Sequence, residues 1–242
     1  MEWNDEGLIL AKRRHAETAA IVDVLTATRG RWTGLVRGGR SRAMRPVLQA
    51  GNLVKVRWRA RIEDHLGTFT IEPIALKAGE LMADPLRLAG LGTLTALLQL
   101  LPEREAHPRL YEASRIILDA LTDWDAWPAL LVRWELGLLD EIGFGLDLSR
   151  CAATGSPDDL IYVSPKTGRA VSASAGAPYR ERLLSLPGFL CGSQAGPSGP
   201  EDILAGFRLT GYFLDRHVFG PRGLTAPEQR HWITDRLAQT SH

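Results

Sequence analysis

The sequence predicts an α+β protein: a small N-terminal β-barrel, then a helical bundle, an irregular insert and closing helices. Three observations carry this prediction. Short apolar runs with a period of two fill residues 7–76, between turn signals. From residue 84 the apolar period becomes helical, and between 145 and 200 glycine, proline and serine interrupt it. The expected segments are 1–80, 81–146, 147–200 and 201–242.

The first segment is expected to hold five strands, at 7–12, 18–26, 32–36, 53–60 and 67–76. Arg29-Gly30-Arg31 reads as a turn, and Thr68 and Thr70 favour a strand. Five short strands, mostly joined by tight turns, suggest a small closed barrel. The OB-fold is the common five-stranded solution with a nucleic-acid-binding face. An SH3-like barrel is the alternative, because strand count alone does not separate the two.

The helices of the second segment are expected to begin at prolines, which suit the first helical turn. These are Pro85, with Asp84 before it as the expected cap, Pro108 and Pro128. Three helices joined by short links make a bundle. In the insert only 180–186 looks helical, and the last segment is expected to form a helix over 201–219 and another after Thr225, which has capping-box spacing to Glu228. We expect the last two helices to pack on the bundle.

Residues 29–61 carry ten basic side chains and no acidic one. In the strand at 53–61, alternation turns four of the basic residues to one face and directs Val54, Val56 and Trp58 into the core. Most charge runs are ordinary solvated faces, which mix signs, and this run does not. Residues 37–42 form a glycine-hinged basic loop that could follow a phosphate backbone. We interpret the stretch as a nucleic-acid-binding surface.

Charge is distributed unevenly along the chain. The net charge is +5 over residues 1–80, −7 over 81–160 and +3 over 161–242, although the total is only +1. A basic module attached to an acidic one is therefore expected. Trp58 shares the parity of the core residues, whereas Trp32 follows Arg31 and could be exposed for base stacking or buried. The candidate DNA-binding residues are Arg13, Arg37, Arg40, Arg42, Arg45, Lys55, Arg57, Arg59, Arg61 and Trp32.

No sequence motif for catalysis is present: there is no P-loop, nucleophile elbow or HExxH. Asp140, Glu141 and Asp147 could suggest a metal-dependent nuclease, but a charge cluster at a helix end explains them equally well. We therefore expect no catalytic residue and no enzymatic activity.

Arg133 stands beside Trp134 on a helix that is otherwise apolar or acidic. It could form a salt bridge with Glu135 or Asp140, or with another helix. It could instead bind a partner's tail that ends in a carboxylate beside an apolar side chain.

Several motifs follow one another along the chain: GLIL at 7–10, LVRGGRS at 35–41, the helix exit at 133–145 followed by Cys151, and YVSPKTGR at 162–169. In their order and spacing they resemble the RecO family of bacterial recombination mediators. The resemblance covers nearly the whole chain. It implies an OB-fold, a helical domain and, in many members, a four-cysteine zinc motif in the insert.

The resemblance also implies binding of single- and double-stranded DNA, annealing of complementary strands, and loading of recombinase onto coated single strands. The implied partners are RecR and the acidic C-terminal tail of single-stranded DNA-binding protein. No secretory signal or membrane span is visible, so we expect a cytoplasmic, nucleoid-associated protein acting on DNA damage. An OB-type RNA-binding or ribosome-associated module is the alternative.

The insert departs from the family pattern in its zinc ligands. Structural zinc needs four Cys or His ligands, usually as two close pairs. Cys151 has no such partner, since Cys191 is forty residues away, and Thr154, Ser164 and Gly168 stand where ligands would be needed. We expect the insert to be metal-free, and two isolated cysteines fit a reducing compartment.

We predict that the purified protein carries no stoichiometric zinc and that a chelator leaves its melting temperature unchanged, because the ligand set is incomplete. Elemental analysis and thermal melting with and without chelator measure this. A value near one zinc per chain would contradict the prediction.

Overall fold

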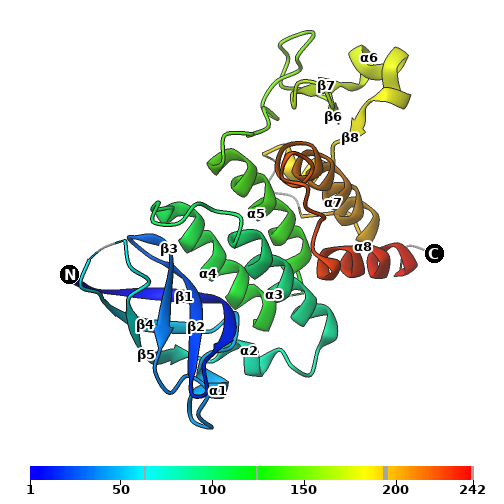
Figure 1. The fold of residues 1–242 in the computed structure, drawn as a ribbon. Coiled ribbons are helices and arrows are strands. Elements are labelled where there is room, and N and C mark those ends of the chain that lie inside the picture. The colour runs from blue at the N-terminus through cyan, green and yellow to red at the C-terminus, as the bar shows by residue number, and fades with distance from the viewer. Residues whose placement is uncertain (63, 124, 193–195, 241–242) are drawn as a thin grey trace. The chain divides into compact units, whose positions relative to one another are not determined.

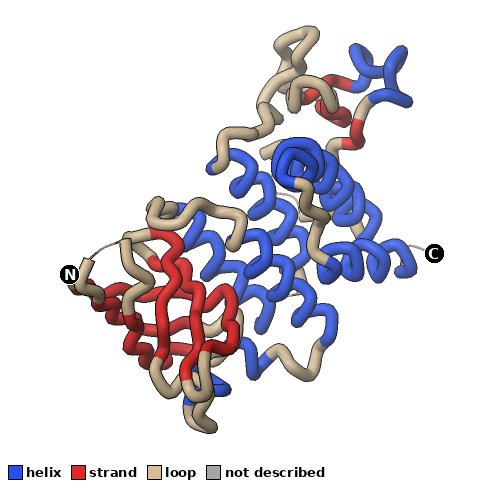
Figure 2. Tube along the Cα trace, in the orientation of Figure 1, coloured by secondary structure: helices blue, strands red, loops and turns tan. Residues whose placement is uncertain are grey.

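Figure 1 shows a computed structural model of the chain, which describes residues 1–62, 64–123, 125–192 and 196–240. The chain divides into two compact units, Met1–Asp125 and Ala126–His242. The first unit contains the barrel strands and two long helices. The second is mainly helical, with a small sheet (Figure 2).

Within its described residues, the first unit forms a closed barrel of five strands. They are β1 (Glu2–His15), β2 (Ala19–Thr26), β3 (Gly30–Val36), β4 (Leu53–Arg59) and β5 (Thr68–Ala75). Their order around the barrel is β1-β2-β3-β5-β4, and only the β3–β5 pairing is parallel. A short helix, α1 (Met44–Val47), lies between β3 and β4. This arrangement confirms the predicted five-stranded barrel of the OB type.

β1 is much longer than the predicted strand at 7–12, because it pairs with two strands, β4 and β2, and so closes the barrel. Residues 2–8 pair with β4, and residues 7–15 pair with β2. A register irregularity between Ile9 and Ala11 marks the bend from one neighbour to the other. A single strand therefore closes the barrel.

The barrel core is built around aromatic rings. Trp3 stacks on Trp58 with ring centroids 5.8 Å apart, and Trp32 meets both at their edges, at 5.2 and 5.0 Å. Phe69 packs edge-on against Trp3. Trp58 is 1% exposed, so the prediction that it belongs to the core is confirmed. Such pairs add about 0.5–1.5 kcal/mol each beyond the area they bury.

The side-chain amide of Asn52 links two short helices, one on each side of it in the sequence, to the barrel. The Asn52 side chain is fully buried. Its Nδ2 donates to the carbonyl oxygens of Pro46 and Val47, at 2.7 and 2.9 Å, and its Oδ1 accepts from the amide of Ala78 at 3.0 Å. Asn52 thereby joins α1 to α2 (Lys77–Glu80), and its polar atoms are satisfied, as burial requires.

Two long helices complete the first unit, α3 (Pro85–Leu98) and α4 (Pro108–Asp123). Asp84 caps α3, as its sequence position predicts, by accepting from the amides of Leu86 and Arg87. Arg87 Nη1 also donates to the carbonyl oxygens of Leu121 and Thr122, at 2.9 and 2.7 Å. This contact places a cation at the negative end of α4.

The second unit is organised by three helices, α5 (Trp127–Glu141), α7 (Pro200–Leu214) and α8 (Glu228–Thr240). A π-helical turn, η3 (Asp215–Phe219), continues α7, and a 3-10 turn, η4 (Gly220–Arg222), follows it. Helices over 201–219 and after Thr225 were expected, so the structure confirms these two.

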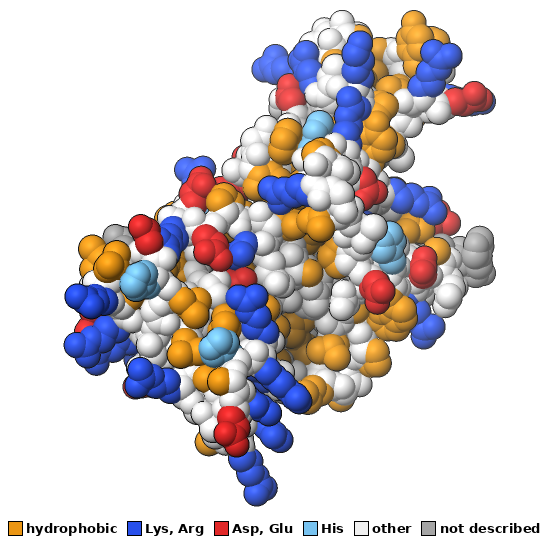
Figure 3. Space-filling view, in the orientation of Figure 1, with side chains coloured by type: hydrophobic (Ala, Val, Ile, Leu, Met, Phe, Trp, Pro, Cys, Tyr) orange, Lys and Arg blue, Asp and Glu red, His pale blue; other side chains and the backbone are white. Residues whose placement is uncertain are grey.

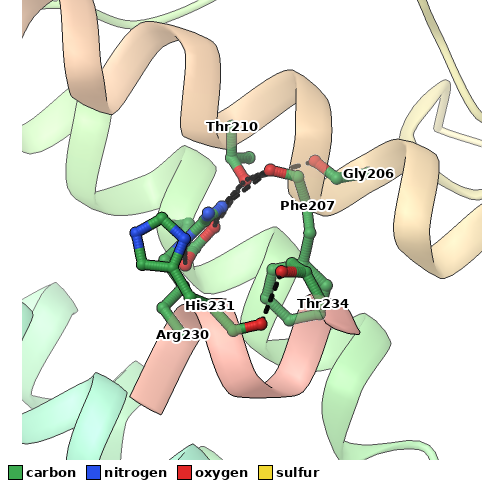
Figure 4. A network of polar contacts seen from close by, with 7 residues as sticks. Gly206, Phe207, Thr210, Arg230, His231 and Thr234 are labelled. Carbon is green, nitrogen blue, oxygen red and sulfur yellow. Dashed lines mark hydrogen bonds and ion pairs between the residues drawn. The ribbon is translucent and has the colours of Figure 1, made fainter. Parts of the chain in front are cut away.

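A buried ion pair joins the three helices of the second unit (Figure 4). Arg230 of α8 donates from Nε and Nη2 to the two carboxylate oxygens of Glu135 of α5, at 2.8 and 2.9 Å. The same Nη2 reaches the Phe207 carbonyl and the Thr210 hydroxyl of α7. Both charged side chains are almost wholly buried. Burial is the largest single influence on the pKa of Arg230 and lowers it, but the charge and hydrogen bonds of Glu135, together with the charge of Asp215, outweigh burial, so the pKa lies above its ordinary value.

The insert of the second unit contains more structure than the sequence indicates. β6 (Leu160–Val163) pairs with β7 (Ala170–Ser172) as a hairpin and with β8 (Leu184–Ser185) on its other side. Two short helical turns, α6 (Ala173–Gly176) and η1 (Ala177–Arg182), lie between β7 and β8. A third, η2 (Gly188–Leu190), follows β8. The expected helix at 180–186 is wrong, because the 3-10 turn η1 ends at Arg182 and the chain then becomes extended to pair with β6.

The division into two units separates helices that the sequence groups together. Helices α3 and α4 belong to the first unit, and α5 belongs to the second. The expected four-segment organisation stays a prediction. Among the described helices, none is long and apolar enough to cross a membrane.

We predict that Arg230→Ala destabilises the second unit by about 3–5 kcal/mol, because it leaves the Glu135 carboxylate buried without a partner. Denaturant unfolding followed by circular dichroism measures this. Arg236→Ala, an exposed change on the same helix, should cost about 0.5 kcal/mol or less. A double variant, Glu135→Leu with Arg230→Met, should recover most of the loss, since it removes both charges. Equal stability of Arg230→Ala and Arg236→Ala would contradict the assigned role of the pair.

Candidate nucleic-acid interface

The basic residues of β4 lie on the outer face of the barrel, as the alternation predicts. Lys55, Arg57 and Arg59 are exposed, whereas Val54, Val56 and Trp58 are buried. Arg61 follows the strand and is also exposed. We call Lys55, Arg57 and Arg59 the β4 row.

The sheet places acidic side chains beside the β4 row. Glu2 of β1 lies opposite Arg59, and Glu6 lies opposite Lys55. On the other side, Glu72 of β5 also lies opposite Lys55. Directly opposite residues share a face. The expectation that this face carries one sign of charge is therefore wrong: residues 29–61 contain no acid, but the neighbouring strands supply three.

A more uniform basic surface lies at the end of the barrel next to α1. Five cationic side chains, with Ala20, Gly39 and Gln49, line a surface hollow of ≈ 380 Å³. The five are Lys12, Arg13, Arg14, Arg40 and Arg45. Arg37 and Arg42 are exposed in the turn that leads into α1. We call these seven residues the barrel-end cluster. Figure 3 shows Lys and Arg side chains gathered at the lower end of the barrel.

The barrel-end cluster is short of counter-charges. Within the described part of the chain, only Arg40 among the seven has its guanidinium engaged, donating to the backbone carbonyl oxygens of Ala16 and Glu17 at 2.9 and 2.6 Å. That contact holds the β1–β2 turn, where Glu17 is the adjoining acid. Partial burial and the charge of Arg45 lower the pKa of Lys12, which is the effect expected of a cation among cations. Such a cluster favours a bound polyanion.

Trp32 is not available for stacking on a base. Its side chain is 5% exposed, and its Nε1 donates to the Arg29 carbonyl at 2.8 Å. The Arg104 guanidinium lies 4.8 Å above its ring. The expectation that Trp32 might be exposed is therefore corrected. Its parity with the buried Gly34 and Val36 in β3 was the signal that places it inside.

Arg31, one of the ten basic residues, has a structural role. It forms an ion pair with Asp23 of β2 and donates to the carbonyl oxygens of Gln99 and Leu101, the latter at 2.7 Å. Burial raises the pKa of Asp23 to about 6, although Arg31 counteracts it. Gly30 lies so close to this segment that a side chain would meet the carbonyl oxygen of Glu105. Arg31 thus fixes the α3–α4 connection to β3 and is not free for phosphate.

Arg133 forms no salt bridge with Glu135 or Asp140, the neighbours considered from the sequence. It is exposed on α5, and its Nη2 donates to the Phe189 carbonyl at 2.7 Å. Its guanidinium lies 5.6 Å above the Phe189 ring. Glu135 is instead paired with Arg230. Arg133 therefore supports η2 while the rest of its guanidinium faces solvent.

The cysteines of the insert are occupied by other contacts. Cys151 is buried, and its Sγ accepts from the amide of Ser172 at 3.2 Å. Cys191 Sγ is 3.5 Å from the Leu160 carbonyl. Among the described residues, no group of three or more His, Cys, Asp or Glu side chains could hold a metal ion. The donor set does not fit the four-cysteine zinc motif, and the absence of zinc in the protein itself stays a prediction.

Known proteins resemble this chain along nearly its whole length. Residues 1–76 match the family model "Recombination protein O N terminal", and residues 82–225 match "Recombination protein O C terminal". A DNA repair protein RecO of Methylobacterium nodulans is 56% identical, covering 95% of each chain. The one of Agrobacterium fabrum is 57% identical over 93% of this chain and 88% of its own. The one of Brucella abortus is 54% identical over 95% and 93%.

We predict that Arg13→Glu with Arg45→Glu weakens binding to single-stranded DNA about tenfold or more at ~0.1 M salt, because two cations that line the hollow become anions that repel phosphate. Arg57→Glu with Arg59→Glu should lose less, since Glu2 already neutralises those residues. Fluorescence anisotropy of a labelled oligonucleotide measures both, and thermal melting verifies that the variants fold. A larger loss in the β4 variant would identify the β4 row as the main contact.

Proposed function

Because the chain belongs to the RecO family of DNA repair proteins, we propose that it is a recombination mediator. In this proposal the barrel binds single- and double-stranded DNA, the protein anneals complementary strands, and it helps to load recombinase onto coated single strands. It acts without catalysis of its own and in the cytoplasm, at the nucleoid.

The barrel-end cluster is the observation that carries the DNA-binding proposal. Five of its seven cations line one hollow, and their like charges are unfavourable together unless an anion lies between them. The arginines of the cluster project from β1, a turn and a short helix and have flexible side chains. Such side chains suit contacts with the phosphate backbone, which is the same in every sequence, better than recognition of particular bases. Binding is therefore expected to be largely independent of sequence and strongly dependent on salt.

Annealing follows from the same electrostatics. Two DNA strands repel each other through their phosphates, and a cationic surface that contacts both lowers that repulsion. The cluster spreads over β1, the β3–α1 turn and α1, so its cations project from three segments rather than along one line. This spread supports contact with more than one strand. The β4 row, with Lys55, Arg57 and Arg59, is proposed as a secondary contact, and Arg61 is proposed to extend it.

The second unit is proposed to recruit protein partners. Arg133 is proposed to bind the acidic C-terminal tail of single-stranded DNA-binding protein, because it is exposed and a guanidinium has further donors for a carboxylate besides the Nη2 that binds the Phe189 carbonyl. RecR is the other proposed partner.

The proposal is tested with the full chain and labelled single-stranded DNA, titrated at several salt concentrations. We expect tight binding at low salt and a slope of log affinity against log salt of about −0.7 for each phosphate contacted. Mixing complementary oligonucleotides with the protein should accelerate duplex formation, and incubation with magnesium or manganese should leave labelled DNA uncut. Preference for structured RNA, with no annealing, would replace this proposal by the RNA-binding alternative.

We predict that Arg133→Ala weakens binding of a peptide ending in an acidic, carboxylate-terminated tail by about tenfold or more, because a charge-assisted contact contributes roughly 1.5–3 kcal/mol. DNA binding should be nearly unchanged, since Arg133 lies outside the barrel. Arg208→Ala, an exposed change on α7, is the matched control. Isothermal titration calorimetry measures the affinity for the peptide. Thermal melting shows whether loss of the Arg133 contact with Phe189 lowers the stability of the fold. Equal effects of the two variants on the peptide would exclude Arg133 as its socket.

A further inference from the structure

Glu2 is held against the β4 row by the sheet. As the first residue of β1, it lies directly opposite Arg59. Its Oε1 accepts from Arg57 Nε at 2.6 Å and also contacts Arg57 Nη2, and its Oε2 is 3.9 Å from Arg59 Nε. The three side chains remain 36%, 57% and 78% exposed. The contact is therefore open to an incoming ligand.

The Glu2 carboxylate occupies the position that a phosphate would need. A guanidinium binds a carboxylate and a phosphate with the same donors and nearly the same geometry. A strand that reaches Arg57 must displace Glu2 or lie beside its negative charge. Lys55, the third cation of the β4 row, lies between Glu6 and Glu72, so it is no more available to a phosphate than Arg57 is. Among the described residues, no ion pair joins a carboxylate to the barrel-end cluster, although Asp23 interacts electrostatically with Arg13.

We infer that Glu2 is a built-in competitor for phosphate, which makes the barrel-end cluster the main site for a bound strand and reduces the β4 row to a secondary contact. This inference rests on the proposed DNA binding and specifies where on the barrel it occurs. Exposed ion pairs are weak, so Glu2 limits the row without closing it, and its removal is worth about two- to fivefold in affinity. A longer footprint is then available whenever Glu2 is displaced.

The test uses the full chain carrying Glu2→Gln, which keeps the size of the side chain and removes its charge. Labelled oligothymidylates of increasing length are titrated at several salt concentrations. We expect the variant to bind about two- to fivefold more tightly at ~0.1 M salt. The salt dependence should steepen by about 0.7 to 1.4, for one or two added phosphate contacts. Affinity should also keep rising to longer oligonucleotides than for the unaltered protein.

Two controls separate a local effect from a general one. Glu80→Gln removes the same charge from α2 and should leave affinity and footprint unchanged. In a chain with Arg57→Ala and Arg59→Ala, Glu2→Gln should no longer have an effect, because the residues through which it acts are gone. The inference is overturned if Glu2→Gln binds like the unaltered protein, if Glu80→Gln gives the same gain, or if the gain survives in the arginine-free background. If the unaltered protein binds no DNA at all, the proposed function itself fails.

Discussion

The closure of the barrel by β1 is the constraint on which the rest of the first unit depends. One strand pairs with β4 along its first half and with β2 along its second, changing neighbour at the irregularity near Ile9. The closed circle of strands seals the tryptophan core, and no edge of the barrel is left through β1 for another chain to extend. A break in either pairing would therefore open the core and the surface together.

The same strand distributes the charge. Glu2 and Glu6, near its start, are brought beside the arginines of β4, whereas Lys12, Arg13 and Arg14, near its end, join the turn before α1. The strand thus neutralises one face of the barrel and adds charge to another. This is why the basic row on β4 faces more carboxylates than the barrel-end cluster does.

Sequence periodicity predicted what depends on neighbours along the chain. Local alternation along β4 predicts that Lys55, Arg57 and Arg59 point outward and that Trp58 is buried. Capping chemistry predicts the cap at Asp84. Partners distant in sequence were not predictable. Nothing near Arg31 indicates its contacts with Gln99 and Leu101, and nothing near Glu135 indicates a partner ninety-five residues away. The charges that β1 and β5 bring to β4 needed the strand order as well as the strands.

The Arg230–Glu135 pair has a consequence for the order in which the protein is made. The first unit is continuous in sequence and complete at residue 125. The second unit needs α8, which is synthesised about a hundred residues after the first unit, before the Glu135 carboxylate acquires its guanidinium. At typical bacterial elongation rates, roughly 6 to 20 s separate the two events on the ribosome. The barrel can thus fold during translation, whereas the Glu135 carboxylate between α5 and α7 stays unneutralised until α8 has been synthesised.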